Sequence, residues 1–448
     1  MSMRTNLFLS FTCPMVIVAA GHAAAQVKPA GKARPNVVIL LADDMGHADV
    51  SFTGCNDVRT PNIDALAANG IRFTQGYVAA SVCSPSRAGL MTGRYPQRWG
   101  HDDNQPPDLA LSEATIGNRM KELGYFTGMI GKWHLGDTPE LLPPARGFDE
   151  TYHPDGNAIY FGARVLDSLK SNKFEPPTDN TLYTTELNSA RAADFIQRHT
   201  DRPFCLYVAF NNVHGPLQVP QKYIDRISPE VTNPDRRKMV AMVLAMDDAV
   251  GVVMQALRET GLEENTLVFF LNDNGGSMQY VPNGVVFNTP FSGGKSTMRE
   301  GGFRTPFVLQ WKARFPVGRT YDRPVSSMDI LPTAVSAAGG TVKPEWNLDG
   351  VNLLPFLQGQ VAGDPHELFC WRMQKANAIR KGDWKALYLE SDRPQLFNLA
   401  EDAAEQNNLA GKHPEKVAEL VADWKQWNAR MAAPRQWTKP VKVKSKEE

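Results

Sequence analysis

Uninterrupted apolar runs alternate with amphipathic segments along most of the chain. Four of these runs have the length of a strand, and they cover residues 36–42, 126–131, 204–210 and 266–272. Runs that are apolar at nearly every position are typical of parallel strands buried on both faces. The pattern therefore predicts an α/β protein in which a large, mostly parallel sheet is sandwiched by helices.

Helix signals occupy the intervals between these runs. Thr60 can cap a helix that has Pro61 in its first turn and ends at Gly70. A longer helical segment starts near Asp235 and ends at Gly261. Helices and strands therefore alternate along the chain, as expected when each helix covers a face of the sheet.

The composition changes after Gly339, where proline and glycine punctuate the sequence. Short strand-like pieces such as residues 383–389 follow, and then a helical segment that begins near Pro414. We therefore predict a catalytic domain over residues 26–350. A smaller α+β subdomain, with a small antiparallel sheet and a helix, is predicted over residues 351–448.

Residues 1–25 have the three regions of a secretory signal peptide. Arg4 precedes an apolar stretch that runs to Ala20, and small residues follow it. A membrane anchor is the less favoured interpretation, because the apolar stretch is short and Pro14 interrupts it. We therefore expect an exported protein, periplasmic or secreted, that begins near Gln26, and we expect no later membrane span.

The overall charge excludes a strong long-range field. Of the 448 residues, 48 are lysine or arginine and 48 are aspartate or glutamate. Such a chain has no global attraction for nucleic acid or for an acidic membrane surface. Any preference for anions must therefore arise from a local cluster of charges.

Four cysteines remain after the predicted signal peptide, too few for a disulfide-held framework. Cys205 lies inside an apolar run, where we expect it to pack as a small hydrophobic residue. The spacing of Cys55 and Cys370 leaves open whether these two form a pair. The fourth, Cys83, lies in a segment that also contains two arginines.

Chemically capable side chains follow each of the four predicted strands. Ligands bind open parallel sheets at the carboxyl ends of the strands, so these side chains are expected to meet. Each has an ordinary structural explanation when taken alone, such as a helix cap for an aspartate pair. Their shared location favours a functional site instead. The residues are Asp43, Asp44, Lys132, His134, His214, Asp273 and Asn274.

A metal site is predicted within this set. Asp43, Asp44, Asp273 and Asn274 offer only oxygen donors. Hard cations such as Ca²⁺ or Mg²⁺ prefer oxygen ligands, whereas zinc would require histidine or cysteine. The sequence therefore indicates one divalent cation at this edge of the sheet.

The helix signals near Cys83 add an anion site. Ser84 has capping chemistry and Pro85 suits the first turn, so Cys83 is expected just before a helix N-terminus, with Arg87 in the first turn. Free backbone N–H groups and the helix dipole attract anions there. Together with a divalent cation, Arg87, Lys132 and Lys295 outweigh the three carboxylates. This positive surplus favours an oxyanion substrate.

Cys83 itself has three interpretations. It can be a buried hydrophobic residue, or a thiolate nucleophile that these surroundings would acidify. A thiolate, however, is a poor partner for a hard, oxygen-coordinated cation, and an oxygen nucleophile would suit such a metal better. The chemistry therefore favours a cysteine that is not used as a cysteine.

The segment Cys83–Arg94, "CSPSRAGLMTGR", resembles the modification signature of the formylglycine-dependent (type I) sulfatases in the alkaline phosphatase superfamily. A second signature of that family resembles "GYFTGMIGKWHLG", Gly124–Gly136. Further similar stretches, which extend the resemblance over nearly the whole mature chain, are "ADDMG", "NDNGG", "GGKSTMREGGFRTP", "DILPTAVSAAGG" and "DGVNLLPFLQG". The resemblance, to arylsulfatases and N-acetylgalactosamine sulfatases, implies an alkaline-phosphatase-like fold with a large mixed sheet.

The resemblance also implies a role for each candidate residue. Cys83 would be oxidised to formylglycine (3-oxoalanine) by a formylglycine-generating or sulfatase-maturating enzyme, and its hydrated aldehyde would be the nucleophile. Arg87 and Lys132 would hold this group, and His134 would act as the base. His214 and Lys295 would bind the sulfate and help protonate the leaving oxygen. The ligands of Ca²⁺, or of Mg²⁺, would be Asp43, Asp44, Asp273, Asn274 and the oxygen that replaces the sulfur of Cys83.

The function that the resemblance implies is hydrolysis of sulfuric esters through a sulfo-enzyme intermediate, with a sulfated poly- or oligosaccharide as the expected substrate. Two alternatives stay open. One is a phosphate or phosphonate monoester hydrolase on the same scaffold. The other is an inactive sulfoglycan-binding protein in which Cys83 stays unmodified.

Two weaker signals lie beside the site. Glu300 and Arg304 are expected to form a structural pair that shapes the backbone near Lys295. His101, Asp102 and Asp103 could line a substrate subsite, although a solvated loop is the preferred interpretation.

Overall fold

The computed structural model describes residues 34–435 except 106–108, 157–158, 172 and 177–178. The predicted signal peptide, residues 1–25, lies outside the described residues. The chain from Arg34 onward forms one compact unit. The boundary at residue 350 between a catalytic domain and a C-terminal subdomain therefore stays a prediction.

The four predicted strands lie side by side in a ten-stranded sheet. At its centre β1 (Asn36–Ala42) pairs in parallel with β8 (Phe204–Ala209) and β9 (Thr266–Asn272). On the far side of β8 follow β4 (Phe126–Gly131) and then β5 (Glu150–Pro154), again in parallel. The predicted strands are confirmed, and their carboxyl ends share one edge of the sheet.

The outer strands make the sheet mixed. On one side β10 runs antiparallel to β9, β2 antiparallel to β10, and β11 parallel to β2. On the other side β6 and β7 continue the sheet in antiparallel pairs beyond β5. These strands are β2 (Ile71–Phe73), β6 (Val165–Asp167), β7 (Phe174–Glu175), β10 (Phe307–Gln310) and β11 (Arg319–Tyr321).

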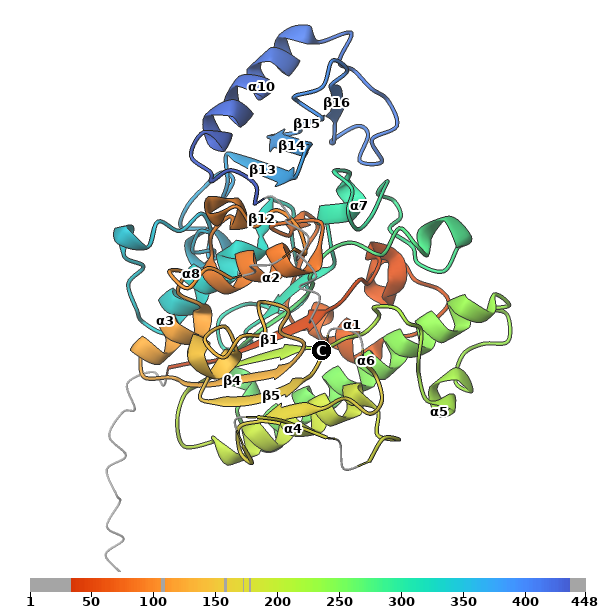
Figure 1. Ribbon diagram of the computed structural model, residues 1–448, viewed down its shortest axis with the longest axis vertical. Helices are drawn as coiled ribbons and strands as arrows, with labels where there is room; N and C mark the ends of the chain where they lie inside the picture. Colours follow the sequence, from red (N-terminus) through yellow and green to blue (C-terminus); the bar gives the residue numbers. More distant parts are fainter. Residues whose placement is uncertain (1–33, 106–108, 157–158, 172, 177–178, 436–448) are drawn as a thin grey trace, which may run out of the picture. The chain divides into compact units, whose positions relative to one another are not determined.

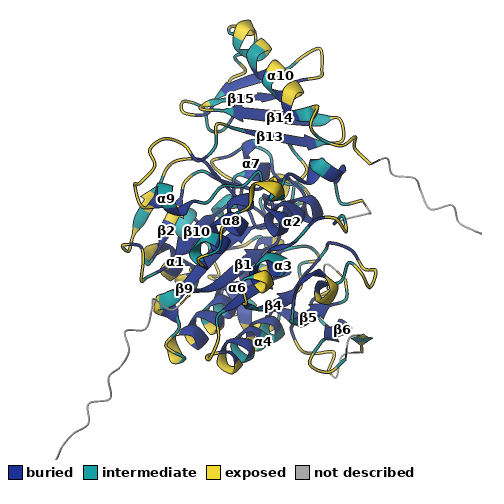
Figure 2. Cartoon of the chain, turned by 90° about the vertical axis from the view of Figure 1, so that its left-hand side faces the viewer, coloured by how far each residue is buried: buried dark blue, intermediate teal, exposed yellow. Residues whose placement is uncertain are grey.

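Helices cover both faces of the sheet, as predicted (Figure 1). Alternate side chains of β1 enter two separate cores, Leu40 on one face and Ile39 on the other. The first core contains residues of α1 (Pro61–Ala68), α4 (Thr184–Arg198) and α6 (Pro234–Glu259). The second contains residues of α2 (Cys83–Thr92), α3 (Ile116–Glu122) and α8 (Ile330–Ala337). The sheet between them is buried on both faces (Figure 2).

Helix α6 is by length and composition apolar enough to cross a membrane, which differs from the expectation of no such segment. In the folded protein, however, 78% of its most apolar 18-residue window is buried. Its apolar character is explained by its position in the core between α1 and α4.

A four-stranded antiparallel sheet and one helix follow in the C-terminal part of the chain, the elements that the sequence predicted there. One face of this sheet packs on α10 through Leu396, Leu420 and Trp424. The other face packs on Phe303 and neighbouring residues of the preceding part of the chain. The elements are β13 (Leu368–Met373), β14 (Ala376–Lys381), β15 (Trp384–Leu387), β16 (Gln395–Asn398) and α10 (Pro414–Asn428).

Several short elements complete the described chain. Two strands, β3 (Gly76–Tyr77) and β12 (Val325–Ser326), pair with each other. The short helices are α5 (Gln221–Ile224), α7 (Glu300–Phe303) and α9 (Leu354–Leu357). Cys55, Cys83, Cys205 and Cys370 are all free and buried, so Cys55 and Cys370 do not pair.

Neither residue predicted to cap a helix forms a side-chain cap bond, although Thr60 does occupy the N-cap position of α1. Helix α2 begins at Cys83 itself, and the hydroxyl of Ser84 lies 2.9 Å from Nε2 of His101 instead of capping the helix. At α1 the side chain of Thr60 makes no cap bond. The carboxylate of Asp247, on α6, instead accepts hydrogen bonds from the N–H groups of Asn62 (3.1 Å) and Ile63 (2.8 Å). A side chain distant in sequence thus replaces a local cap.

We predict that Asp247→Ala lowers the free energy of unfolding by about 1–3 kcal/mol, because it leaves buried N–H groups of α1 without acceptors. Denaturant titration followed by circular dichroism measures this change. The neighbouring Asp248, which pairs with Arg226 at the surface, provides the matched control. Asp248→Ala should change the free energy by less than about 1 kcal/mol. Equal losses for the two variants would contradict the capping role.

Candidate active site

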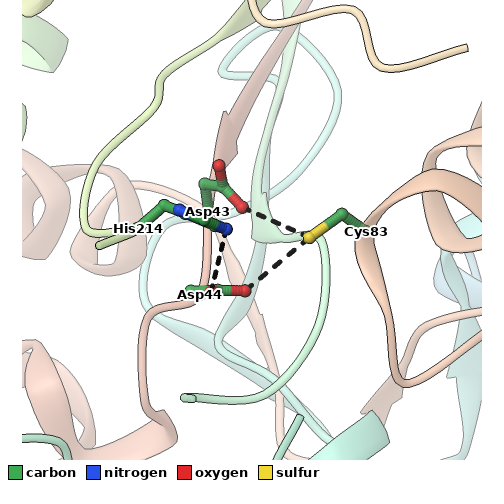
Figure 3. Close-up of side chains that lie close together, drawn as sticks. All are labelled: Asp43, Asp44, Cys83 and His214. Atoms are coloured by element: carbon green, nitrogen blue, oxygen red, sulfur yellow. Dashed lines mark hydrogen bonds and ion pairs between the residues drawn. The ribbon is translucent and has the colours of Figure 1, made fainter. Parts of the chain in front are cut away.

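Asp43 and Asp44 follow the central strand β1 and are almost completely buried. The backbone of Asp44 is left-handed, with φ at 57°, so consecutive side chains can both be directed toward one site. In Figure 3 the two carboxylates lie beside the sulfur of Cys83, which belongs to α2. The sulfur atom is 3.7 Å from Oδ1 of Asp43 and 3.8 Å from Oδ1 of Asp44.

Two buried cations neutralise Asp43. Lys132, just after β4, places Nζ 2.6 Å from Oδ2 of Asp43, and Arg87 approaches Oδ1 to 3.6 Å. All three side chains have no exposed surface. Burial alone would raise the pKa of Asp43, but the charges of Lys132, His214 and Arg87 lower it overall. The carboxylate is therefore held in its ionised form.

Asp273 and Asn274 approach the same place from the end of β9. Asp273 accepts from Nε of Arg87 at 2.9 Å and from the N–H of Asp44 at 3.3 Å. Burial, and then repulsion by Asp43, raises the pKa of Asp273 despite these partners. Asn274 donates from Nδ2 to Asp44 at 2.8 Å, so its side-chain amide lies beside the cluster.

Lys295 and His214 lie at the more open side of Asp44. Nζ of Lys295 is 2.7 Å from the Asp44 carboxylate, and Nε2 of His214 is 3.5 Å from it. Burial would lower the pKa of Lys295, but Cys83 and Asp44 raise it overall, so the side chain is a cation. Both residues retain some exposure, 15% for Lys295 and 27% for His214. They are placed where an entering anion would meet them.

His134 lies two residues after Lys132 and has φ at 58°. Burial, together with the charges of Lys132, Arg87 and Lys295, lowers the pKa of this imidazole far below its usual value. The ring is therefore neutral. Its buried Nδ1 has no hydrogen-bond partner within the described part of the chain.

The expected acidification of the Cys83 thiol was wrong. Burial, the largest cause, raises the pKa of this thiol well above its usual range, and the carboxylates of Asp273, Asp44 and Asp43 raise it further against the lowering effect of Lys132. The side chain has no exposed surface. A thiolate at this position is therefore disfavoured, which removes the main support for cysteine as the nucleophile.

The cluster contains a possible metal site. One potential ligand atom from each of Asp43, Asp44, Cys83 and His214 lies within 4.8 Å of the other three. The buried Oδ1 of Asn274 has no hydrogen-bond partner among the described residues. A buried amide oxygen without a donor is costly, and a cation would satisfy it. Asp273 lies beside this group, but its Oδ2 already accepts a hydrogen bond from Arg87.

All ten residues predicted for the site are thus brought together at one edge of the sheet. Sequence analysis did not identify several residues whose hydrogen bonds hold these site residues in place. The buried phenol of Tyr160 contacts the carbonyl oxygens of Asn211 (2.5 Å) and His214 (2.6 Å) and holds the His214 loop. Asn104 accepts a hydrogen bond from the N–H of Ser84 at 2.9 Å. A single tyrosine or asparagine in a predicted loop carries no signal that distinguishes such a role.

The preferred interpretation of a solvated loop is wrong for His101 and Asp102, which are buried, whereas Asp103 is only partly buried. His101 is 1% exposed and Asp102 is 4% exposed. Asp102 forms an ion pair with Arg372 of β13, at 2.6 Å. The expected pair of Glu300 and Arg304 is confirmed, with 3.5 Å between the charged groups.

Comparison with known proteins adds the following similarities. Residues 35–340 match the protein family described as Sulfatase. N-acetylgalactosamine-6-sulfatase from Canis lupus familiaris is 34% identical over 380 residues, which is 79% of this chain and 71% of that protein. Arylsulfatase A from Bos taurus is 32% identical over 448 aligned residues, with 88% of this chain and 86% of that protein covered.

Among solved structures, Ps i-CgsB in complex with k-i-k-neocarrahexaose has a TM-score of 0.82 and 34% sequence identity, and the match covers 90% of this chain and 95% of that one. The phosphonate monoester hydrolase of Agrobacterium radiobacter has a TM-score of 0.67 at 20% identity, with 88% and 96% covered. The latter similarity concerns the fold alone.

We predict that Asn274→Ala weakens binding of a divalent cation by at least about 10-fold, because it removes the buried oxygen that has no other partner. Calorimetric titration of the metal-depleted protein with Ca²⁺ measures the affinity. Asn283→Ala, an exposed asparagine in the same loop after β9, serves as the control and should bind as the wild type does. Unchanged affinity of the Asn274 variant would exclude it as a ligand.

Proposed function

The chain belongs to the sulfatase family and is a sulfuric ester hydrolase, and we propose that it desulfates a sulfated carbohydrate by means of a formylglycine made from Cys83. The observation that carries this proposal is the position of Cys83. Its sulfur lies at a helix N-terminus, against two carboxylates and three buried or half-buried cations. This environment suits an oxygen nucleophile that reacts with an oxyanion, and it disfavours a thiolate.

The hydrated aldehyde of formylglycine supplies an oxygen nucleophile with a second hydroxyl, and a bound Ca²⁺ or Mg²⁺ supplies positive charge beside it. We assign the cation to Asp43, Asp44, Asp273, Asn274 and the oxygen that takes the place of the Cys83 sulfur. The short distances among Asp43, Asp44 and Cys83, and the contact of Asn274 with Asp44, support part of that assignment. Asp273 is included because it follows β9 beside Asp44.

The chain's own cations organise the reaction. Arg87 and Lys132 hold the nucleophile and neutralise the carboxylates beneath it. Lys295 and His214, on the open side, bind the sulfuryl oxygens and spread the negative charge that develops there. His214 or Lys295 also delivers a proton to the leaving oxygen. We assign His134, by its resemblance to the family's base, to accept the proton whose loss releases sulfate.

The carbohydrate assignment rests on two relatives. One is named an N-acetylgalactosamine-6-sulfatase, and one solved structure contains a neocarrahexaose. Both share 34% of their aligned residues with this chain. A phosphate or phosphonate monoester is the alternative substrate, and an inactive sulfoglycan-binding protein is the non-enzymatic one.

The proposal includes an exported protein, periplasmic or secreted, and a maturation enzyme. The side chain of Cys83 has no exposed surface. A formylglycine-generating or sulfatase-maturating enzyme would therefore have to act on it before this part of the chain is folded.

The test is production of the protein with and without such a maturation enzyme, followed by mass spectrometry of the peptide that contains residue 83. The matured protein should hydrolyse 4-nitrophenyl sulfate and release sulfate from sulfated oligosaccharides. It should hydrolyse 4-nitrophenyl phosphate much more slowly. Full activity with an intact thiol at position 83 would overturn the proposal, and faster phosphate hydrolysis would favour the alternative substrate.

We predict that Cys83→Ser and Cys83→Ala each lower kcat by at least about 1,000-fold, because the nucleophile is lost. The serine variant has one hydroxyl that can be sulfated but no second hydroxyl whose deprotonation releases sulfate. Intact-mass measurement after incubation with substrate should therefore show a bound sulfuryl group on the serine variant and none on the alanine variant. A serine variant that turns over at the wild-type rate would exclude this role.

A further inference from the structure

A buried lysine of the C-terminal sheet reaches the loop that carries Lys295. Lys385 lies on β15 and has no exposed surface. Its Nζ is 2.8 Å from Oε1 of Glu300 and 3.0 Å from Oε1 of Glu405. Removal of these charges from water is expensive, so each side chain depends on the others for compensation.

Glu300 connects this lysine to α7 and to Tyr77 of β3, which lie outside the C-terminal sheet. It is the first residue of α7, and its Oε2 accepts a hydrogen bond from the buried phenol of Tyr77 at 2.5 Å. Arg380, on the neighbouring strand β14, donates to the same phenol. The charged cluster therefore lies in the interface between the C-terminal sheet and α7.

Glu405 forms hydrogen bonds with both ends of the loop between Ser292 and Glu300. Its Oε2 accepts from the N–H of Glu300 at 2.7 Å and from Oγ of Ser292 at 3.1 Å. Its backbone carbonyl accepts from Arg299 at 2.6 Å. The two ends of the loop also bind each other, since the N–H of Gly301 donates to the carbonyl of Ser292 at 2.8 Å.

Lys295 lies in the middle of this loop, and the loop backbone contacts the site directly. The N–H of Lys295 donates to Gly276 at 3.0 Å, and the N–H of Ser296 donates to Ser81 at 2.8 Å. Ser81 lies two residues before Cys83. A shift of the loop would therefore move Lys295 relative to both Asp44 and Cys83.

Helix α7 also contacts the turn that carries Asn274. The N–H of Gly275 donates to the carbonyl of Gly302 at 3.0 Å. A Cβ atom at position 275 would lie only 1.6 Å from the carbonyl oxygen of Gly301, so the two backbones are in the closest contact that glycine permits. A displacement of α7 would reach Asn274 directly.

We propose that Lys385, together with Glu300 and Glu405, is a strut through which the C-terminal sheet positions Lys295 and Asn274. A hydrophobic core of equal volume could stabilise this interface as well or better, so stability does not explain three buried charges. Directional bonds to both ends of one loop do explain them. The inference rests on the proposed function, because it assigns Lys295 and Asn274 to sulfate and cation binding. Lys385, Glu300 and Glu405 are positioning residues that touch neither.

The experiment compares variants of the matured full-length protein by kcat and KM on 4-nitrophenyl sulfate, Ca²⁺ affinity and thermal unfolding. Lys385→Met removes the central charge. Glu405→Ala removes the acceptor for both loop ends, whereas Glu405→Gln keeps an acceptor oxygen. Ser292→Ala removes only one hydrogen bond at the rim of the strut and leaves the buried charges intact.

Two variants are matched controls within the C-terminal part. Lys381→Met, one strand away, removes a lysine whose partners are Asp423 at 2.8 Å and Glu419 at 3.2 Å, both on α10. Leu396→Ala opens a cavity in the core beneath α10 and lowers stability without a contact to α7. Measurements are made at a temperature at which every variant is folded.

We expect Lys385→Met and Glu405→Ala to lower kcat by about 10- to 100-fold and to weaken Ca²⁺ binding by about 10-fold. Glu405→Gln should fall between Glu405→Ala and the wild type, and Ser292→Ala should lower kcat by a smaller factor. The two control variants should keep the kcat, KM and Ca²⁺ affinity of the wild type, although Leu396→Ala unfolds at a lower temperature.

Two results would overturn the strut. The first is a set of strut variants that lose thermal stability but keep kcat and Ca²⁺ affinity. The second is a loss of kcat in Leu396→Ala as large as in Lys385→Met. If Lys385→Met does not fold, Ser292→Ala and Glu405→Gln decide, and wild-type kinetics in both would reject the proposal. Failure of the proposed function is distinct, because the wild-type protein would then have no sulfatase activity.

Discussion

The parallel pairing of β9, β1, β8 and β4 is the constraint on which the site depends. Adjacent parallel strands end at the same edge of the sheet, so one short segment after each strand reaches a common point. Asp43, Lys132 and Asp273 are far apart in the sequence but become direct or near neighbours for this reason. Helix α2 then brings Cys83 to the same point from outside the sheet.

Charge compensation determines how this edge is built. Three carboxylates within a buried volume would repel one another, and each would favour its protonated form. Arg87 bridges Asp43 and Asp273, Lys132 pairs with Asp43, and Lys295 pairs with Asp44. These cations hold acidic groups close together. In the proposed function, Lys295 would also bind the sulfate, so the same side chain would serve both the folded state and the substrate.

Most of the fold and of the site could be predicted because their signals are local. The central strands are uninterrupted apolar runs, and each site residue follows such a run or lies in a dense motif such as Cys83–Arg94. Features that depend on distant contacts could not be predicted. Asp247 replaces Thr60 as the cap of α1 from 185 residues away, and Lys385 meets Glu300 across an interface. The low acidity of the Cys83 thiol follows from complete burial, which a helix signal does not reveal.

The hydrogen bonds between Glu405 and the loop of Lys295 can form only late in synthesis, because Glu405 lies near the C-terminal end of the described chain. Ribosomes extend a chain by roughly 5–20 residues per second, so Glu405 leaves the ribosome some tens of seconds after Cys83. Until then the loop lacks the contacts that hold its two ends. The nascent chain therefore passes through an interval in which the cysteine has emerged but its pocket cannot be complete. Under the proposed function, this interval, which follows from the order of the elements along the chain, is the one in which a maturation enzyme would reach Cys83.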